Sequence, residues 1–461
     1  MSPERRLSRA RLGALATFFL AGALCAVWTV RMPALKAKLD LTDAQLGLEV
    51  LGWGVGALIT MLVAGRIIGR YGSRRVLRLA LPGTAGCLAL VGLAPNFALL
   101  IVTGLAFGLC FGLVDVSMNT QASTVERRYG RPLMGGMHAG WSLGAVTGGL
   151  LGAGTAWIGL GFTGALCLVA ALSVPAILAI GPLYLSEGAL PRPGASSAAA
   201  GSADAADGSA SLTGPATSFT PAAPGARASG SGSPTDSFVP STPTARARRP
   251  RLPRLPLLVY LFGAIVFCSY LAEGSVADWS GVYLRESLGA TEVVATFGYP
   301  MFEASMFLGR MFSDKLTLRF GARLLITVAG CASAAAFLLV VLAPGPSTAL
   351  VGFALVGLGV CAVSPLAMSL SGAAGGAHTE RAIATASTLG YSGLLLGPVS
   401  IGFISAATSL RIGYAVVIGV CVAIAVGATF VPRGRHIENR GEHGDAVDRS
   451  GDPGVRCEVA V

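Results

Sequence analysis

Apolar stretches of about 20 residues recur along this chain, and they constrain its fold more than any other feature. Each stretch is long enough for a helix to cross about 30 Å of hydrocarbon. The alternating segments of about ten residues that build a transmembrane barrel are absent. Since the sequence is also 53% apolar and only 12% charged, it predicts an all-α membrane protein.

The apolar stretches predict 12 transmembrane helices, arranged as six, a break and six more. The expected spans are 12–33, 43–65, 76–94, 97–119, 135–156, 161–184, 257–279, 291–313, 324–343, 348–371, 382–405 and 412–432. This grouping predicts two pseudo-symmetric six-helix bundles, the first at 1–185 and the second at 257–432. Residues 186–256 are mostly small or polar and cannot bury enough apolar surface to offset the entropy of ordering, so we expect a disordered cytoplasmic linker. The same argument predicts a disordered cytoplasmic tail at 433–461.

The net charge of +11 follows the topology of the chain. Of 34 Lys and Arg residues, 29 fall in the N-terminus, the even-numbered loops and the C-terminal tail. Only Arg31, Lys36, Lys38, Arg285 and Arg411 fall in the odd-numbered loops. The positive-inside rule therefore predicts a multi-pass protein of the cell (plasma) membrane with both termini in the cytoplasm. The basic residues mark topology, and we expect no binding to nucleic acid.

An acid and an amide lie one helical turn apart inside the fourth apolar stretch. Asp115 and Asn119 share one helix face, because positions i and i+4 are neighbours on a helix. A carboxylate at the centre of a membrane costs roughly 2.5–3.5 kcal/mol on insertion scales, which marks it as a functional candidate. A carboxyl that alternates between dry and wet surroundings can carry a proton. The alternative is a structural Asp115 paired with Asn119 or with a loop arginine.

Other polar and aromatic side chains within the spans are candidates for contact with a solute. His138 and Trp141 are three residues apart on the fifth span and share one helix face. An aromatic ring there could stack on a sugar while an imidazole binds a hydroxyl. Glu273 and Glu303 are acids within the seventh and eighth spans, and packing or interhelical hydrogen bonds are the alternative for all four residues. Glu49 is expected to reach water. Further substrate candidates are Trp28, Thr29 and Tyr391.

Paired segments repeat between the halves. The turn from Gly65 to Arg75 after the second span has a counterpart from Gly309 to Arg323 after the eighth. Repetition of this kind is typical of repeat transporters, whose substrate site lies between the halves. Its glycines could let helices pack closely and its basic residues could anchor or gate the cytoplasmic side. The gating candidates are Gly65, Arg66, Arg70, Gly72, Arg74, Gly309, Arg310, Asp314, Gly321 and Arg323.

With these motifs the chain resembles the major facilitator superfamily, and within it the fucose-permease group. The segments 18–22, 32–33 and 41–47 follow that group's first-helix pattern. Segments 114–119, 126–128, 138–144, 273–274 and 278–280 are similar to the rhizopine-transporter-like (MosC-type) branch. The resemblance implies proton coupling through Asp115, sugar contact near His138 and a cytoplasmic gate at the repeated turns. Two departures are Gly69, where the gating motif carries an acid, and Thr29, where the fucose permeases carry one, which makes fucose itself an unexpected substrate.

The sequence therefore predicts a secondary active transporter that moves a small polar organic solute, sugar-like or polyol-like, by alternating access with proton symport. Proton-driven efflux of drug-like compounds and a non-transporting membrane sensor are the alternatives. No metal-ligand spacing, nucleophile motif or phosphate loop is present, so we predict neither an enzyme nor a cofactor or metal site. The expected partners are the lipid bilayer, the solute and protons, and the expected state is a monomer.

Overall fold

The computed structural model describes residues 3–130, 133–185 and 255–432. In this part of the chain the secondary structure is helical. The elements of the first half are α1 (Pro3–Val30), α2 (Met32–Leu39), α3 (Asp43–Tyr71), α4 (Ser73–Leu93), α5 (Phe97–Tyr129), α6 (Met134–Trp157), α7 (Phe162–Ile180) and η1 (Gly181–Leu183). Those of the second half are α9 (Leu257–Val282), η2 (Tyr283–Ser287), α10 (Glu292–Ala295), α11 (Gly298–Phe320), α12 (Ala322–Val341), α13 (Pro346–Val360), α14 (Val363–Gly375), η3 (Gly376–His378), α15 (Thr379–Ala407) and α16 (Leu410–Thr429).

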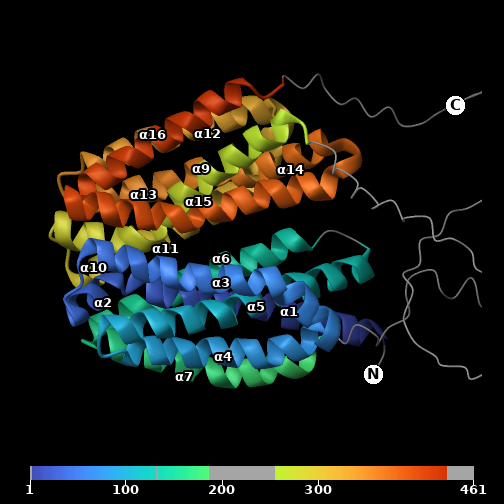
Figure 1. The fold of residues 1–461 in the computed structure, drawn as a ribbon, viewed down its shortest axis with the longest axis horizontal. Helices are drawn as coiled ribbons and strands as arrows, with labels where there is room; N and C mark the ends of the chain where they lie inside the picture. Colours follow the sequence, from blue (N-terminus) through green and yellow to red (C-terminus); the bar gives the residue numbers. More distant parts are fainter. Residues whose placement is uncertain (1–2, 131–132, 186–254, 433–461) are drawn as a thin grey trace, which may run out of the picture.

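The helices form two layers that lie side by side. Helices α1 to α7 make up one layer and α9 to α16 the other, and the described chain begins and ends at the same end of the molecule (Figure 1). The short helices α2 and α10 lie at the opposite end (Figure 1). Between the layers, α3 packs against α15 and α6 packs against α11. These are the two largest contacts between the halves.

Polar residues at the helix ends show why the long helices begin and stop where they do. Thr42 and Gln45 form a capping box at the start of α3, with the Thr42 hydroxyl accepting from the Gln45 backbone N–H. Asn96 caps α5 in the same way through the N–H of Leu99. Such caps satisfy backbone donors that have no partner inside the helix. Helix α5 ends at Gly130, whose φ of 66° favours glycine.

Glycines set equivalent helix contacts in the two halves. A Cβ at Gly144 of α6 would lie 2.0 Å from the backbone oxygen of Phe19 in α1. A Cβ at Gly393 of α15 would lie 2.2 Å from the backbone oxygen of Phe267 in α9. Membrane helices approach closely where small residues meet, because packing drives their association. The segments that repeat in the sequence therefore make matching contacts in the two halves.

Every predicted span coincides with helix, although ten of the long helices in the described chain pass a length and apolarity criterion for crossing a membrane. The two that fall short are α6 and α11, which contact each other between the halves. Glycines and His138 lower the apolarity of α6, while Glu303 and Arg310 lower that of α11. The count of 12 spans stays a prediction. The described chain contains two bundles, whereas the predicted linker and tail lie almost wholly outside the described residues.

Some predicted spans are not single helices, and two of the second half show this most clearly. The span 291–313 divides into α10 and α11, and Pro300 lies in the first turn of α11. The span 348–371 divides into α13 and α14 near Cys361, four residues before Pro365. A proline ring clashes with the carbonyl four residues earlier, which explains a break there. Helix α5 is also ten residues longer than the predicted span 97–119, because polar residues extend the helix beyond its apolar part.

Candidate functional site

A cavity of about 500 Å³ lies between the halves and contains the acid and amide of α5. The Asn119 amide donates to the backbone oxygen of Asp115 at 2.9 Å and to its carboxylate Oδ1 at 3.4 Å. Tyr391 of α15 lines the same cavity from the other half. The full lining is Met61, Asp115, Val116, Asn119, Thr120, Ser123, Arg127 and Tyr391. The structure therefore brings together predicted proton-coupling and substrate residues from both halves.

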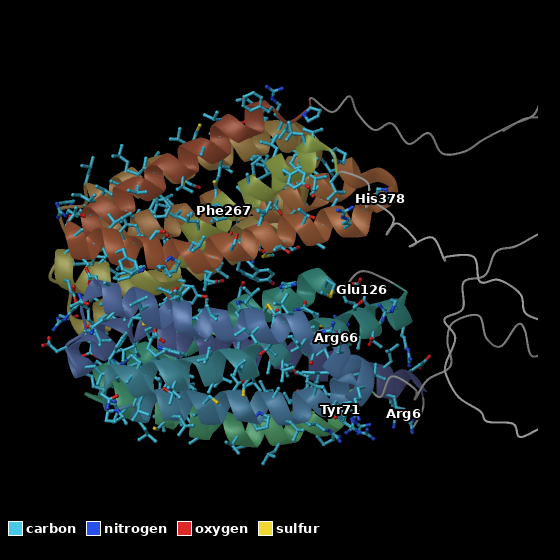
Figure 2. The ribbon with its side chains drawn as sticks, viewed as in Figure 1. Arg6, Arg66, Tyr71, Glu126, Phe267 and His378 are labelled. Carbon is cyan, nitrogen blue, oxygen red and sulfur yellow. The ribbon has the colours of Figure 1, made fainter. Side chains whose placement is uncertain are left out.

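The cavity extends from half-buried Asp115 to exposed Arg127 near the end of α5. We call this end of the molecule, where α3 and α5 end, the open end. Arg66, Tyr71, Glu126 and His378 lie there (Figure 2). Arg127 donates to the hydroxyls of Ser123 and Thr124 on its own helix. Sequence reasoning missed Arg127 as a cavity residue because it ended the span at 119; the basic pair at 127 and 128 was the available signal.

His138 and Trp141 lie on one side of the first half, against an aromatic row. The His138 ring meets Phe18 edge-on, with ring centroids 5.3 Å apart, and is exposed. Trp141 meets Phe111 at 5.9 Å. From Phe111 the row continues through Phe107 to Trp28, with centroid separations of 5.7 and 4.9 Å. Trp28 and Trp141, both predicted substrate residues, are therefore connected through two phenylalanines rather than in direct contact.

The acids of the second half lie around Arg310. Glu303 of α11 accepts a hydrogen bond from the Tyr299 hydroxyl at 2.9 Å, and Glu273 of α9 accepts from Ser269 at 3.0 Å. Arg310 lies close enough to interact electrostatically with both carboxyls and with His138 across the interface. Ser142 of α6 lies near the Glu303 carboxyl, so an interhelical contact remains the alternative to substrate binding for this acid.

The predicted gating glycines serve different purposes in the structure. Gly72 and Gly321 join α3 to α4 and α11 to α12 with φ values of 78° and 79°, which favour glycine. This matching geometry explains why both turns carry glycine. Gly309 lies against Cys361, where a Cβ would come within 2.5 Å of the sulfur. Gly65 has open space around it, so the expected close packing does not occur there in this conformation.

The predicted gating arginines vary in exposure. Arg66 and Arg70 are exposed, whereas Arg74, Arg310 and Arg323 are half-buried. Arg70 lies over the ring of Tyr71 at 5.5 Å. Asp314 lies on α11, but its side chain is not among those that the structure describes.

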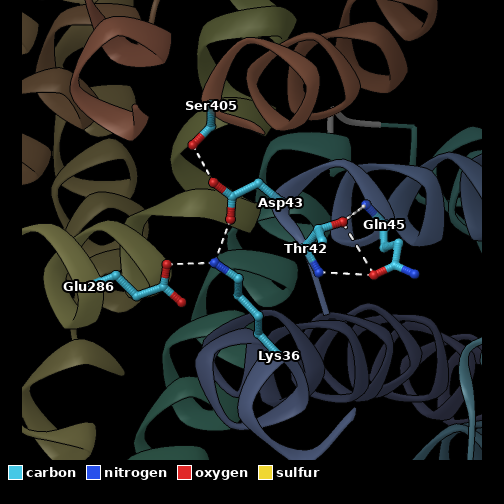
Figure 3. A network of polar contacts seen from close by, with 6 residues as sticks. All are labelled: Lys36, Thr42, Asp43, Gln45, Glu286 and Ser405. Atoms are coloured by element: carbon cyan, nitrogen blue, oxygen red, sulfur yellow. Dashed lines mark hydrogen bonds and ion pairs between the residues drawn. The ribbon is translucent and has the colours of Figure 1, made fainter. Parts of the chain in front are cut away.

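Polar and charged groups hold the opposite end of the interface, which we call the closed end. They come from the α1–α2 junction, α2, α3, η2, α10 and the end of α15. Lys36 of α2 contacts Glu286 of the other half and Asp43 of its own half, at 2.5 Å each. Asp43 accepts in turn from Ser405 of α15 (Figure 3). Arg31, with a fully buried side chain, pairs with Glu292 of α10 at 2.8 Å. The ion pairs of Arg31 and Lys36 therefore all lie at this end.

Lys36 lies outside the membrane-spanning helices, and its surroundings favour the charged form. Burial lowers the pKa of Lys36, but the Asp43 and Glu286 carboxylates raise it by more, so the pKa lies above its ordinary value. Sequence reasoning treated Lys36 only as one of the few basic residues of the odd-numbered loops. Nothing in a single sequence indicates which acid of the other half such a lysine will meet.

The structure corrects the expectation that Glu49 reaches water. The sequence placed this acid near water, yet its side chain on α3 is 0% exposed. Neither carboxylate oxygen has a hydrogen-bond partner. Helix α5 covers it, because Gly104 leaves room for the Glu49 carboxylate beside Trp28.

Comparisons with known proteins agree with this architecture. The family model described as Major Facilitator Superfamily matches residues 13–379 and again 263–451. The chain is 31% identical over 416 residues to the transporter y4wD of Sinorhizobium fredii, covering 90% of this chain and 96% of that one. It is 27% identical over 428 residues to membrane protein MosC of Rhizobium meliloti, covering 91% and 89%. The latter relative supports the predicted branch.

Solved structures share the fold. The nucleoside transporter NupG superposes with a TM-score of 0.61 at 14% identity, covering 91% of this chain and 98% of that one. The D-xylose-proton symporter gives a TM-score of 0.64 at 14% identity, covering 92% and 98%. At these identities the likeness concerns the fold alone. Together with the family match, it shows that the chain belongs to the Major Facilitator Superfamily and is a multi-pass membrane transporter rather than an enzyme.

Proposed function

We propose that this transporter moves a small polar organic solute, sugar-like or polyol-like, by alternating access with proton symport. The main support for this proposal is the difference between the two ends of the interface. Both halves line a cavity at one end, and ion pairs join the halves at the other. A solute site between two rocking halves needs this arrangement. By the positive-inside rule, the open end faces the cytoplasm.

The cavity lining favours a polar solute. Asp115, Asn119, Thr120 and Ser123 present a carboxyl, an amide and two hydroxyls along one helix. Tyr391 supplies an aromatic face with a polar tip from the other half. Such groups bind hydroxyls by hydrogen bonding and a sugar ring by contact with its apolar face. A volume of about 500 Å³ lies within the usual range of small-molecule sites.

Asp115 is the proposed proton carrier. Its carboxylate has Asn119 as a hydrogen-bond partner and lines the cavity, so it meets water in this conformation. Closure of the cavity would remove that water and favour the neutral carboxyl. Solute transport is then coupled to proton transport if the solute and the proton enter this cavity together and leave it together.

Thermal stability of the purified protein against a panel of inositols, amino-polyols, sugars and drug-like cations, at two pH values, tests this proposal. A ligand stabilises a protein according to its concentration relative to its dissociation constant. We expect a sugar-like or polyol-like ligand whose effect is stronger at the lower pH, and loss of that pH dependence in Asp115→Asn. Stabilisation by hydrophobic cations alone would contradict the proposal and favour efflux.

A further inference from the structure

A second pair of carboxyl groups lies at the interface, away from the open cavity. Glu49 of α3 is 0% exposed, and Asp278 of α9 in the other half is 7% exposed. The two are close enough to interact electrostatically. Glu49 lies beside Gly104 of α5, which is 11 residues before Asp115. At 1.5 Å per residue this separation is about 16 Å along the helix, so the pair is distinct from Asp115.

The surroundings of this pair are mostly apolar. Asp278 lines a void of about 20 Å³. The other lining residues are Cys25, Trp28, Thr29, Met32, Trp53 and Phe107. The indole N–H of Trp28 is buried and has no hydrogen-bond partner, like both carboxylate oxygens of Glu49. The void has room for about one water molecule and is too small for an organic solute.

Within the described residues, neither carboxyl is a member of an ion pair. Asp278 is the only charged group recorded as acting on Glu49 within the described chain. The other titratable groups that interact with Asp278 are Cys25 of α1, Tyr299 of α11 and Tyr414 of α16. A charged Glu49 would be strongly unfavourable, because its buried carboxylate has no hydrogen-bond donor and an isolated charge loses its hydration. A proton on Glu49 removes that cost, and the neighbouring Asp278 favours this neutral form.

We propose that Glu49 and Asp278 form a second proton-binding site, which holds a proton while the closed end of the interface is closed. A proton suits the pair better than a metal cation, since hard cations need six or more oxygen ligands. When the halves separate at this end, α3 moves away from α9 and water reaches the pair. The proton then passes from the carboxyl oxygen to water, leaving a hydrated carboxylate. This inference rests on alternating access but not on the identity of the solute or the role of Asp115.

Infrared spectroscopy of the purified protein, titrated with pH in H₂O and D₂O, tests the proposal without any solute. A protonated carboxyl in apolar surroundings has a carbonyl band that separates from those of amides and carboxylates. We expect this band at neutral pH in the wild type and a lower intensity of the band in Glu49→Gln. The control variant Glu4→Gln changes an exposed glutamate and should keep the band. An unchanged band intensity in a folded Glu49→Gln, or absence of the band from the wild type, would overturn the proposal.

Two further variants keep the test decisive. Asp278→Asn should shift the pH at which the band disappears, because it removes the neighbouring charge; an unchanged titration would show that the two carboxyls do not form one site. This variant also serves if Glu49→Gln fails to fold. Asp115→Asn should leave the band in place. Loss of transport in Asp115→Asn with the band retained would separate the second site from the proposed coupling residue.

Discussion

The two ends of the interface between the halves differ in what joins them. At the closed end Lys36 and Arg31 pair with acids of the second half, and Ser405 donates to Asp43. At the open end the interface contains a cavity lined by Asp115 and Tyr391. The Lys36 pairs come from short helices and helix termini, where partly exposed ion pairs contribute little individually, whereas the Arg31 side chain is fully buried. The difference teaches that closure depends on a small number of polar contacts between the halves, which can be exchanged between two states.

The largest expected effect comes from the open end. Asp115→Asn should reduce proton-driven uptake into liposomes to background, since an amide cannot carry a proton. The matched control is Asp40→Asn, which makes the same change at an exposed position with φ 50° that asparagine tolerates. Uptake that still follows an imposed pH gradient in Asp115→Asn would exclude this residue as the carrier.

A wedge at the interface should open the closed end. A Cβ at Gly149 of α6 would lie 2.2 Å from Pro300 of α11 in the other half. Gly149→Ala should therefore disfavour closure by about 1–3 kcal/mol, the usual cost of overpacking. The distance between spin labels at Asp40 and Thr408, in a variant without native cysteines, measures opening. Gly154→Ala on the same helix has open space and should leave this distance unchanged; a similar shift in both variants would exclude the wedge.

Loss of one lysine should have a smaller effect. Lys36→Met removes contacts to Asp43 and Glu286 and should favour opening by about 1 kcal/mol, roughly a fivefold change in population. Lys38→Met makes the same chemical change, but Lys38 donates to the carbonyls of Gly92 and Ala94 within its own half. The distance between the same two labels should therefore increase only in Lys36→Met. Equal changes in both variants would contradict a role of Lys36 in holding the closed end together.

The smallest expected effect is the response of the Lys36 contacts to pH. Because the pKa of Lys36 lies above its ordinary value in the closed state, its contribution is complete below the ordinary lysine pKa. The contribution is lost only as the pH rises through the raised pKa. Between neutral and mildly alkaline pH, the distance between the two labels in the wild type should thus show no change caused by deprotonation of Lys36. A change near neutral pH that disappears in Lys36→Met would contradict this assignment.

Much of the fold could be predicted because apolar length and glycine spacing are local properties. The helix positions followed from hydropathy, and the paired turns at Gly72 and Gly321 indicated a repeat that the structure bears out in backbone conformation. Helix breaks were harder, since Pro365 disrupts the backbone one turn before its own position.

The site was only partly predictable. Asp115 and Asn119 could be paired from their spacing on one helix, whereas Tyr391 meets them from a helix more than 250 residues away along the chain. Glu49 was misjudged because its depth depends on Gly104 of another helix, which sequence distance from a span end does not show. Contacts between the halves, such as Lys36 with Glu286, depend on the conformation of the whole transporter.

The most direct test of alternating access measures both ends in the same protein. One label pair at Asp40 and Thr408 reports the closed end, and another at Arg66 and His378 reports the open end. When a transported solute is added, we expect a population in which the first distance lengthens while the second shortens. Solute uptake with both distances unchanged, or changing in the same direction, would contradict the account.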